Sequence, residues 1–218
     1  MTTFCTDLDL LHWEPNIFRD AAFASQTLLS GSAALAGTTL TIASGSLIAA
    51  HASADGVVVL GGAVAGSFPI VSVDSATVCT ISVLYDQLFP DEGDPVPSPI
   101  GTASGLTFTI RTFWAQRRIV SELLNQAAGI EPTSDPFNSP QIVNPKALKR
   151  ACMLGTLQMI YNALAAATGA PDEYAVRADL YQQLYRRAMR STNVEIDLNN
   201  DGVADERRQL NVLRLARR

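Results

Sequence analysis

The spacing of apolar residues changes twice along this chain, and this constrains its fold more than any other feature. Apolar residues recur at helical spacing from Ile17 to about Ser30 and again from Thr112 onward, but they alternate at strand spacing between residues 37 and 111. A strand section between two helical sections predicts an α+β protein in which a small β-domain is inserted into a helical scaffold.

Five short segments of the middle section have the composition and alternation of strands. They cover residues 38–42, 56–60, 69–73, 77–83 and 106–110. The first and the last, within GTTLTI and GLTFTI, have similar patterns, and this set of short strands favours a small five-stranded β-barrel, closed or half-open. The glycine-rich residues 61–66 fit no nucleotide-binding pattern, which favours a hairpin loop.

Three helical patterns follow the strand section. The first begins at Thr112 and stops at Gly129, and a loop with four prolines at residues 131–145 separates it from the second, at residues 146–168. The second is apolar almost all round, so we expect it to be buried on every side, either within its own bundle or by neighbouring subunits. With the third, at residues 172–190, and the N-terminal helix, the pattern predicts a bundle of about four helices.

The chain thus divides into three predicted parts. Residues 1–36 and 112–192 form a helical scaffold domain, residues 37–111 an inserted β-barrel-like domain, and residues 193–218 a C-terminal docking arm, either extended or folded as a hairpin. The arm alternates like a strand on both sides of an Asn-Asp-Gly turn and ends in several arginines, which suits addition to an acidic neighbour.

A stripe of large side chains lies on one face of the last predicted helix, at Tyr174, Tyr181, Tyr185 and Met189. Core packing is the default explanation of such a stripe. A subunit interface is the more specific alternative, because tyrosines are common at surfaces that are partly apolar and partly hydrated.

The arm contains the pattern D-x-N-x-D-G-x-x-D, which is similar to the start of a calcium loop. Its ligands would be the side chains of Asp197, Asn199, Asp201 and Asp205 and the carbonyl of Val203. Position twelve of such a loop, where a bidentate acid closes the shell, is Arg208 here. A metal-free turn whose Asn and Asp side chains cap backbone amides is therefore favoured, and we predict neither a metal nor a cofactor.

Charge is unevenly distributed along the chain. The net charge is −5, yet residues 177–218 contain nine arginines and six acids, and no Lys or Arg occurs between Arg19 and Arg111. An acidic surface over most of the chain repels polyphosphate and disfavours a grip on DNA. The most apolar window, residues 47–66, is interrupted by His51 and Asp55, so no membrane span is predicted.

Residues with catalytic potential are few and scattered. His12 and His51 have no partners at triad or metal spacing, and the chain has no phosphate loop, so the sequence predicts that it is not an enzyme. Cys5, Cys79 and Cys152 form no C-x-x-C pair and are expected to be small apolar core residues, not a disulfide framework or a zinc site.

Three helical and terminal segments stand out in the sequence, namely PKALKRACMLGTLQMIYNALA, YAVRADLYQQLYRRAMR and EIDLNNDGVADERRQLNVLRLARR. Through them the chain resembles the head–tail connector, or adaptor, proteins of tailed bacteriophages, over about residues 1–35 and 112–218. The β-insertion departs from the minimal helical form of that family, and its role is open. The alternative hypothesis is that the chain is a calcium-binding adhesion or carbohydrate-binding module whose recognition surface is the barrel.

The resemblance implies a structural virion protein, made in the host cytoplasm and located in the neck of the particle. It implies a ring of about twelve copies that joins the portal protein to a downstream tail or neck protein, while DNA passes through the centre without specific binding. It also implies that the C-terminal segment docks on the portal. The docking residues would be Val194, Ile196, Leu198, Arg207, Arg208, Leu210, Val212, Leu213, Arg214, Leu215, Arg217 and Arg218.

Overall fold

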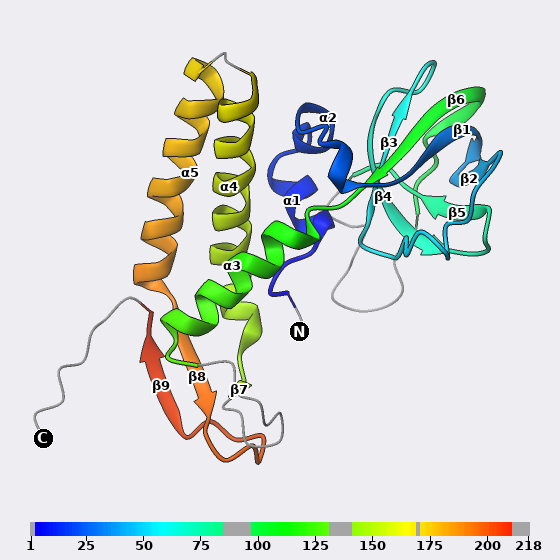
Figure 1. The fold of residues 1–218 in the computed structure, drawn as a ribbon. Coiled ribbons are helices and arrows are strands. Elements are labelled where there is room, and N and C mark those ends of the chain that lie inside the picture. The colour runs from blue at the N-terminus through cyan, green and yellow to red at the C-terminus, as the bar shows by residue number, and fades with distance from the viewer. Residues whose placement is uncertain (1–2, 85–96, 131–140, 169–170, 211–218) are drawn as a thin grey trace, which may run out of the picture. The chain divides into compact units, whose positions relative to one another are not determined.

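The computed structural model describes residues 3–84, 97–130, 141–168 and 171–210 (Figure 1). Most of the proline-rich loop predicted at residues 131–145 therefore lies outside the described residues. The chain divides into two compact units, Thr6–Phe113 and, together, Met1–Cys5 with Trp114–Arg218. They are called the barrel unit and the helical unit below.

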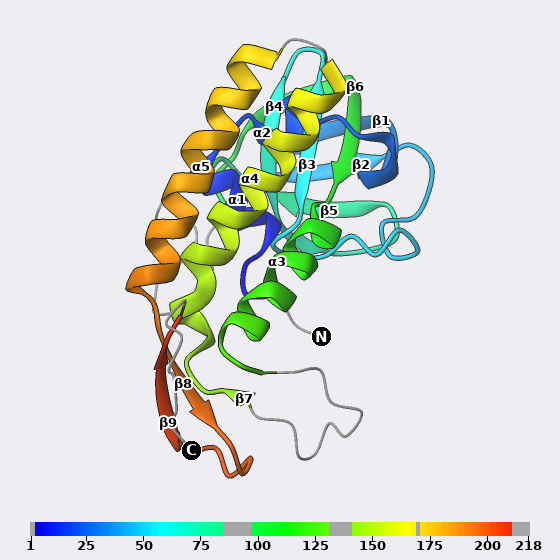
Figure 2. The ribbon, with the colours of Figure 1, turned by 60° about the vertical axis from the view of Figure 1, so that its left-hand side comes forward.

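The barrel unit is built on a closed antiparallel β-barrel of six strands (Figures 1 and 2). The strands are β1 (Thr27–Gly37), β2 (Thr39–Ile42), β3 (Val57–Gly61), β4 (Gly66–Val73), β5 (Val78–Ile81) and β6 (Gly101–Arg111), in the order β1-β2-β5-β4-β3-β6. The two long strands β1 and β6 close the barrel, with Gly37 opposite Gly101 at one end of their ladder and Thr27 opposite Arg111 at the other.

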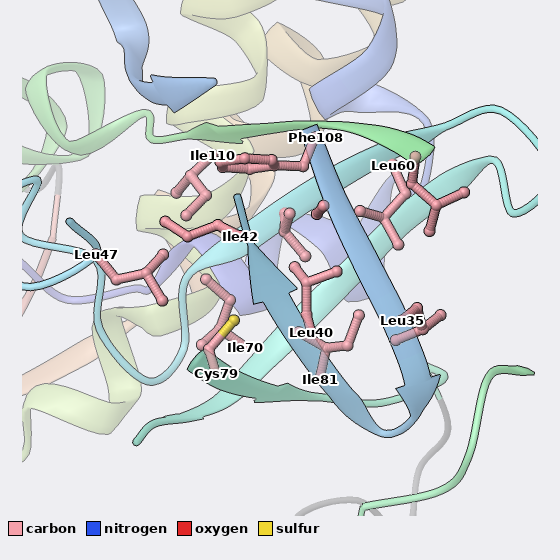
Figure 3. Packing of buried hydrophobic residues seen from close by; sticks show 13 residues of the cluster. Leu35, Leu40, Ile42, Leu47, Leu60, Ile70, Cys79, Ile81, Phe108 and Ile110 are labelled. Carbon is pink, nitrogen blue, oxygen red and sulfur yellow. The ribbon is translucent and has the colours of Figure 1, made fainter. Parts of the chain in front are cut away.

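Alternate residues of these strands fill the barrel interior (Figure 3). Leu40 and Ile42 of β2 point inward, as do Leu106, Phe108 and Ile110 of β6, and all five are almost fully buried. Their period of two is the alternation from which the sequence predicts strands. Cys79 of β5 belongs to the same core, and burial, followed by the charge of Asp74, raises the pKa of its thiol to about 12.

The α+β class and the closed barrel confirm the prediction, but the barrel has six strands and not five. The additional strand is β1, which occupies Thr27–Gly37, where a helical period was predicted as far as Ser30. The prediction of helix over those residues is wrong because pairing with β6 along the length of β1 overrides the local spacing of the two leucines at its start. The N-terminal helical structure is limited to α1 (Asp7–Trp13), α2 (Ile17–Asp20) and the 3-10 turn Ala24–Gln26.

Helix α1 is fixed to the barrel unit by polar contacts at its start. Thr6 and Asp9 form a capping box, and the buried carboxylate of Asp7 accepts the amide of Phe113 (3.0 Å) and the hydroxyl of Thr112 (2.6 Å). The ring of Phe113 in turn packs 4.9 Å from that of Phe18 in α2. These contacts are the physical reason that residues 6–36 cluster with the strands and not with the later helices, where the predicted domain boundaries place them.

The helical unit contains three long helices, α3 (Trp114–Ala127), α4 (Lys149–Thr168) and α5 (Pro171–Ser191), with the 3-10 turn Pro145–Leu148 leading into α4. Both α3 and α5 pack on α4. The side chains of Leu154, Leu157 and Ile160 of α4 are fully buried. Burial on every side, as the sequence predicts for this helix, is not observed: Met153, Gln158 and Met159 are half-buried, and Ala163 and Ala166 are exposed.

A three-stranded antiparallel sheet completes the helical unit, in the order β7 (Gln141–Ile142), β8 (Asn193–Asp197) and β9 (Glu206–Gln209) (Figures 1 and 2). Strands β8 and β9 form a hairpin in which Ile196 pairs with Glu206 and Asn193 with Gln209. The hairpin is one of the two forms predicted for the C-terminal arm, and it belongs to the helical unit as far as Leu210. None of the helices in the described ranges has the length and apolarity needed to span a membrane.

Candidate functional site

An apolar row lies on the solvent-exposed face of α3. Ala115, Ile119, Leu123 and Ala127 follow one another at four-residue intervals, so they share one side of the helix, and all four are exposed. The exposed fraction is 43% for Ile119 and 48% for Leu123. The next side of α3, about 100° round the helix, carries the buried Val120 and Leu124. Helix α3 therefore has two apolar faces, and only one of them is covered.

Charged and aromatic groups lie beside this row. Arg118 forms an ion pair with Glu122 (3.2 Å), and its guanidinium lies 5.2 Å from the ring centre of Trp114, which is itself about half exposed. Apolar residues next to a polar border are the arrangement found in protein–protein interfaces.

A second exposed apolar pair lies on α5. Val176 and Leu180 are one helical turn apart, with exposed fractions of 67% and 51%. The other side of α5, with Ala178, Tyr181 and Met189, is buried. The two helices that pack on α4 thus each expose apolar side chains, and the two sets differ in their residues.

The tyrosine stripe of α5 packs on α4 of the same chain. The ring of Tyr161 lies 5.4 Å from that of Tyr181 and 6.2 Å from that of Tyr174, and its hydroxyl accepts a hydrogen bond from Arg177 (3.0 Å). Tyr185 is half-buried against Gly155 of α4, and Met189 is buried. Tyr174, Tyr181, Tyr185 and Met189 are therefore packing residues within one chain. The exposed apolar residues of α5 are Val176 and Leu180.

The predicted docking residues of the C-terminal arm have three different environments. Val194, Ile196 and Leu210 are fully buried in the helical unit, which corrects their assignment to a docking surface: one face of the hairpin packs within its own chain. Leu198 and Arg207 are exposed. Arg208 is half-buried, and it donates to the carbonyl of Ala128 at the end of α3 (2.8 Å) and forms an ion pair with Glu206 (2.7 Å). The others lie outside the described residues, at Val212, Leu213, Arg214, Leu215, Arg217 and Arg218.

The turn between β8 and β9 is organised by the carboxylate of Asp197. One oxygen accepts the amides of Asn199 (3.1 Å), Asn200 (2.6 Å) and Asp201 (3.3 Å), and the other accepts the amide of Gly202 (2.7 Å). Burial alone would raise the pKa of Asp197, but these four donors together hold its pKa below the ordinary value.

Three other residues of the calcium-like pattern also accept backbone amides, the first being Asn199, whose side-chain oxygen accepts the amide of Asp201 (3.0 Å). Asp201 accepts the amide of Val203 (2.8 Å), and Asp205 accepts the amide of Leu198 (2.7 Å). The side chain of Asn199 donates to Asp201 (3.2 Å). Carboxylate and amide side chains thus cap the backbone donors of this turn.

Two cysteines that are far apart in the sequence meet inside the helical unit. The Sγ of Cys5 lies 2.9 Å from the Sγ of Cys152 in α4, and the hydroxyl of Ser121 in α3 lies 3.5 Å from the same Sγ of Cys152. The hydrogen bond from Cys5 lowers the pKa of the Cys152 thiol to about 7, against the opposite effect of burial and with help from Ser121. The sequence contains no signal for this pair, because its members are separated by 147 residues.

The candidate catalytic residues of the sequence are not brought into a common site. His12 and His51 both lie exposed in the barrel unit, the first in α1 and the second between β2 and β3. Within the described ranges, no three His, Cys, Asp or Glu side chains are grouped so that they could hold a metal ion. Comparison of the chain with protein-family models, with curated proteins and with solved structures found no match.

Proposed function

We propose that this protein is a structural subunit of the neck of a tailed bacteriophage, where it acts as a head–tail connector. Copies of the chain would join through two different surfaces of the helical unit and so form a closed ring. The observation that carries the proposal is the pair of exposed apolar surfaces on α3 and α5, the two helices that pack on α4. These are the α3 row (Ala115, Ile119, Leu123 and Ala127) and the α5 pair (Val176 and Leu180).

Two different apolar surfaces on one subunit favour a heterologous contact, in which the α3 row of one copy packs on the α5 pair of the next. Repetition of such a contact produces a ring when the rotation between neighbours closes, whereas a symmetric dimer would need only one self-complementary surface. The Arg118–Glu122 pair beside the α3 row would supply the polar rim of the contact.

Portal docking in this proposal uses the exposed part of the C-terminal arm. Leu198 and Arg207 remain accessible on the hairpin, and six further arm residues follow it in the sequence. The net positive charge of residues 177–218 suits an acidic partner surface. The acidic character of residues 1–176 agrees with a channel along which DNA slides instead of being gripped.

The proposed contact is tested with one charged substitution in each surface of the full chain. Ile119→Asp places a charge in the α3 row, and Leu180→Asp places a charge in the α5 pair. Each substitution should weaken self-association about 30-fold or more. The exposed Ile48 of the barrel unit offers a matched control, so Ile48→Asp should assemble like the wild type. Mass photometry and negative-stain electron microscopy measure the assemblies, for the chain alone and for the chain co-expressed with a phage portal protein.

A mixture of the two defective variants distinguishes a heterologous contact from a symmetric one. Each pair of unlike variants retains one intact junction, so the mixture should form heterodimers and no rings. Homodimers in either variant alone would indicate a symmetric contact and contradict the ring. If the wild-type chain stayed monomeric both alone and with the portal protein, this would contradict the proposed function.

A further inference from the structure

Cys5 and Cys152 are placed where a covalent bond between them requires little movement. Their sulfurs are 2.9 Å apart, and a disulfide of about 2.0 Å would need them to approach by roughly 1 Å. Cys5 is the last residue of the short N-terminal segment of the helical unit, and Cys152 lies in the first half of α4. Both are thiols in this structure, and their exposed fractions are 2% and 0%.

The N-terminal segment is held in position by contacts other than the sulfur pair. Arg117 of α3 donates to the carbonyl of Cys5 (2.8 Å) and to the hydroxyl of Thr3 (3.3 Å), and the amide of Phe4 donates to Ser121 (3.1 Å). These bonds order the backbone on both sides of the Cys5 side chain. The two sulfurs therefore meet because the fold positions them, before any bond forms between them.

We propose that Cys5 and Cys152 form an oxidative modification site, at which a small peroxide converts the thiol pair into a disulfide that fastens the N-terminal segment to α4. A small oxidant is required because both sulfurs are buried. The proposal needs only the geometry of the helical unit and is independent of the proposed function.

The reaction uses two electrons and balances with hydrogen peroxide. The Cys152 thiolate attacks one peroxide oxygen, the O–O bond breaks, and Cys152 sulfenic acid and hydroxide are formed. The Cys5 thiol then attacks the sulfenyl sulfur, the S–O bond breaks, and the disulfide forms with release of water as the thiol proton is lost. Cys152 is the attacking group because its lowered pKa gives it more thiolate near neutral pH.

Cys79 supplies an internal control within the same chain. It is buried in the barrel core, and its pKa of about 12 leaves almost no thiolate at neutral pH. Peroxide should therefore leave it as a thiol under conditions that oxidise the pair.

The experiment treats the full native chain with hydrogen peroxide, unfolds it in the presence of a maleimide, and maps the peptides by mass spectrometry without reduction. We expect a Cys5–Cys152 cross-linked peptide lacking two hydrogens, together with labelled Cys79. After oxidation, the wild type should keep one of its three thiols, and the Cys79→Ser variant should keep neither of its two. The Cys5→Ser and Cys152→Ser variants should yield no intramolecular cross-link. Dithiothreitol should restore all thiols.

A second measurement detects the cross-link without relying on any variant. The oxidised wild type should melt roughly 5–15 °C above the reduced wild type, because the bond closes a long loop in the unfolded chain. Oxidation of Cys152 to sulfinic acid without a cross-link would overturn the proposal. So would a disulfide that involves Cys79 or a second copy of the chain, or an oxidised protein that melts at or below the reduced one.

Discussion

At the scale of single residues, one carboxylate determines the shape of the C-terminal hairpin. Asp197 is buried and accepts four consecutive backbone amides, whereas Asp201, in the same turn, accepts a single backbone amide and is exposed. The turn also places Asn200 and Gly202 at positive φ, where the backbone depends on these bonds. Loss of the Asp197 side chain would leave the amides of Asn199, Asn200 and Gly202 without this acceptor, whereas the amide of Asp201 would keep its bond to the side chain of Asn199.

We therefore expect Asp197→Ala to lower the melting temperature of the helical unit more than Asp201→Ala, measured by circular dichroism on the full chain. Calcium added to the wild type should leave the melting temperature unchanged, because amide donors already satisfy the Asp197 carboxylate. Equal effects of the two variants would contradict the central role of Asp197. A calcium-dependent rise that Asp201→Ala abolishes would instead favour the calcium-binding alternative.

The same carboxylate predicts a pH dependence. The pKa of Asp197 is lower in the folded chain than the value of about 3.9 in an unfolded one. Its contribution to stability is therefore complete above the unfolded value and is lost as the pH falls through the folded value. The difference in melting temperature between the wild type and Asp197→Asn should be constant above about pH 5 and shrink on further acidification. If the difference in melting temperature instead grew on acidification, the pKa of Asp197 would be raised by folding and not lowered, which would contradict the prediction.

At the scale of elements, α4 requires a glycine where three helices meet. A Cβ on Gly155 would lie 2.8 Å from Cγ1 of Val120 in α3 and 3.1 Å from Cε2 of Tyr185 in α5. Val120 is β-branched and buried, so it has little freedom to move away. Gly155→Ala should consequently destabilise the helical unit by about 1–3 kcal/mol, although alanine is the better helix former.

Asn162→Ala is the matched control for that substitution, because Asn162 is exposed on the same helix. It should stabilise the unit by a few tenths of a kcal/mol through helix propensity alone. Chemical denaturation of both variants makes the comparison. A Gly155→Ala protein as stable as Asn162→Ala would mean that the three helices do not approach as closely as described.

Sequence periodicity predicts the elements whose contacts are local or repeat regularly. The helices α3, α4 and α5 and the alternation of Leu106, Phe108 and Ile110 in β6 follow from spacing alone. Strand β1 does not, because its state is decided by pairing with residues 64 to 84 positions later, from Gly101 opposite Gly37 to Arg111 opposite Thr27. The Cys5–Cys152 pair and the burial of Val194 and Ile196 likewise depend on tertiary contacts that no local pattern encodes.

At the scale of the whole molecule, the chain passes between its two units at only two points, after Cys5 and after Phe113. On the barrel side, the buried Asp7 joins both points by accepting the amide of Phe113 and the hydroxyl of Thr112. On the helical side, Arg117 of α3 donates to the carbonyl of Cys5. Each unit thus holds its own two chain ends together, as an inserted domain requires.

It follows that residues 6–113 should fold without the rest of the chain. The expressed fragment should unfold cooperatively, with dispersed amide resonances, because its hydrophobic core and the bonds of Asp7 are contained within it. Asp7→Ala should reduce the stability of the fragment by about 1–3 kcal/mol, since it leaves a buried amide without its acceptor. The exposed Asp20 provides the control, and Asp20→Ala should change stability by less than about 0.5 kcal/mol. A fragment that remains unfolded, or an Asp7→Ala fragment as stable as its parent, would show that the barrel unit depends on the helical unit for its closure.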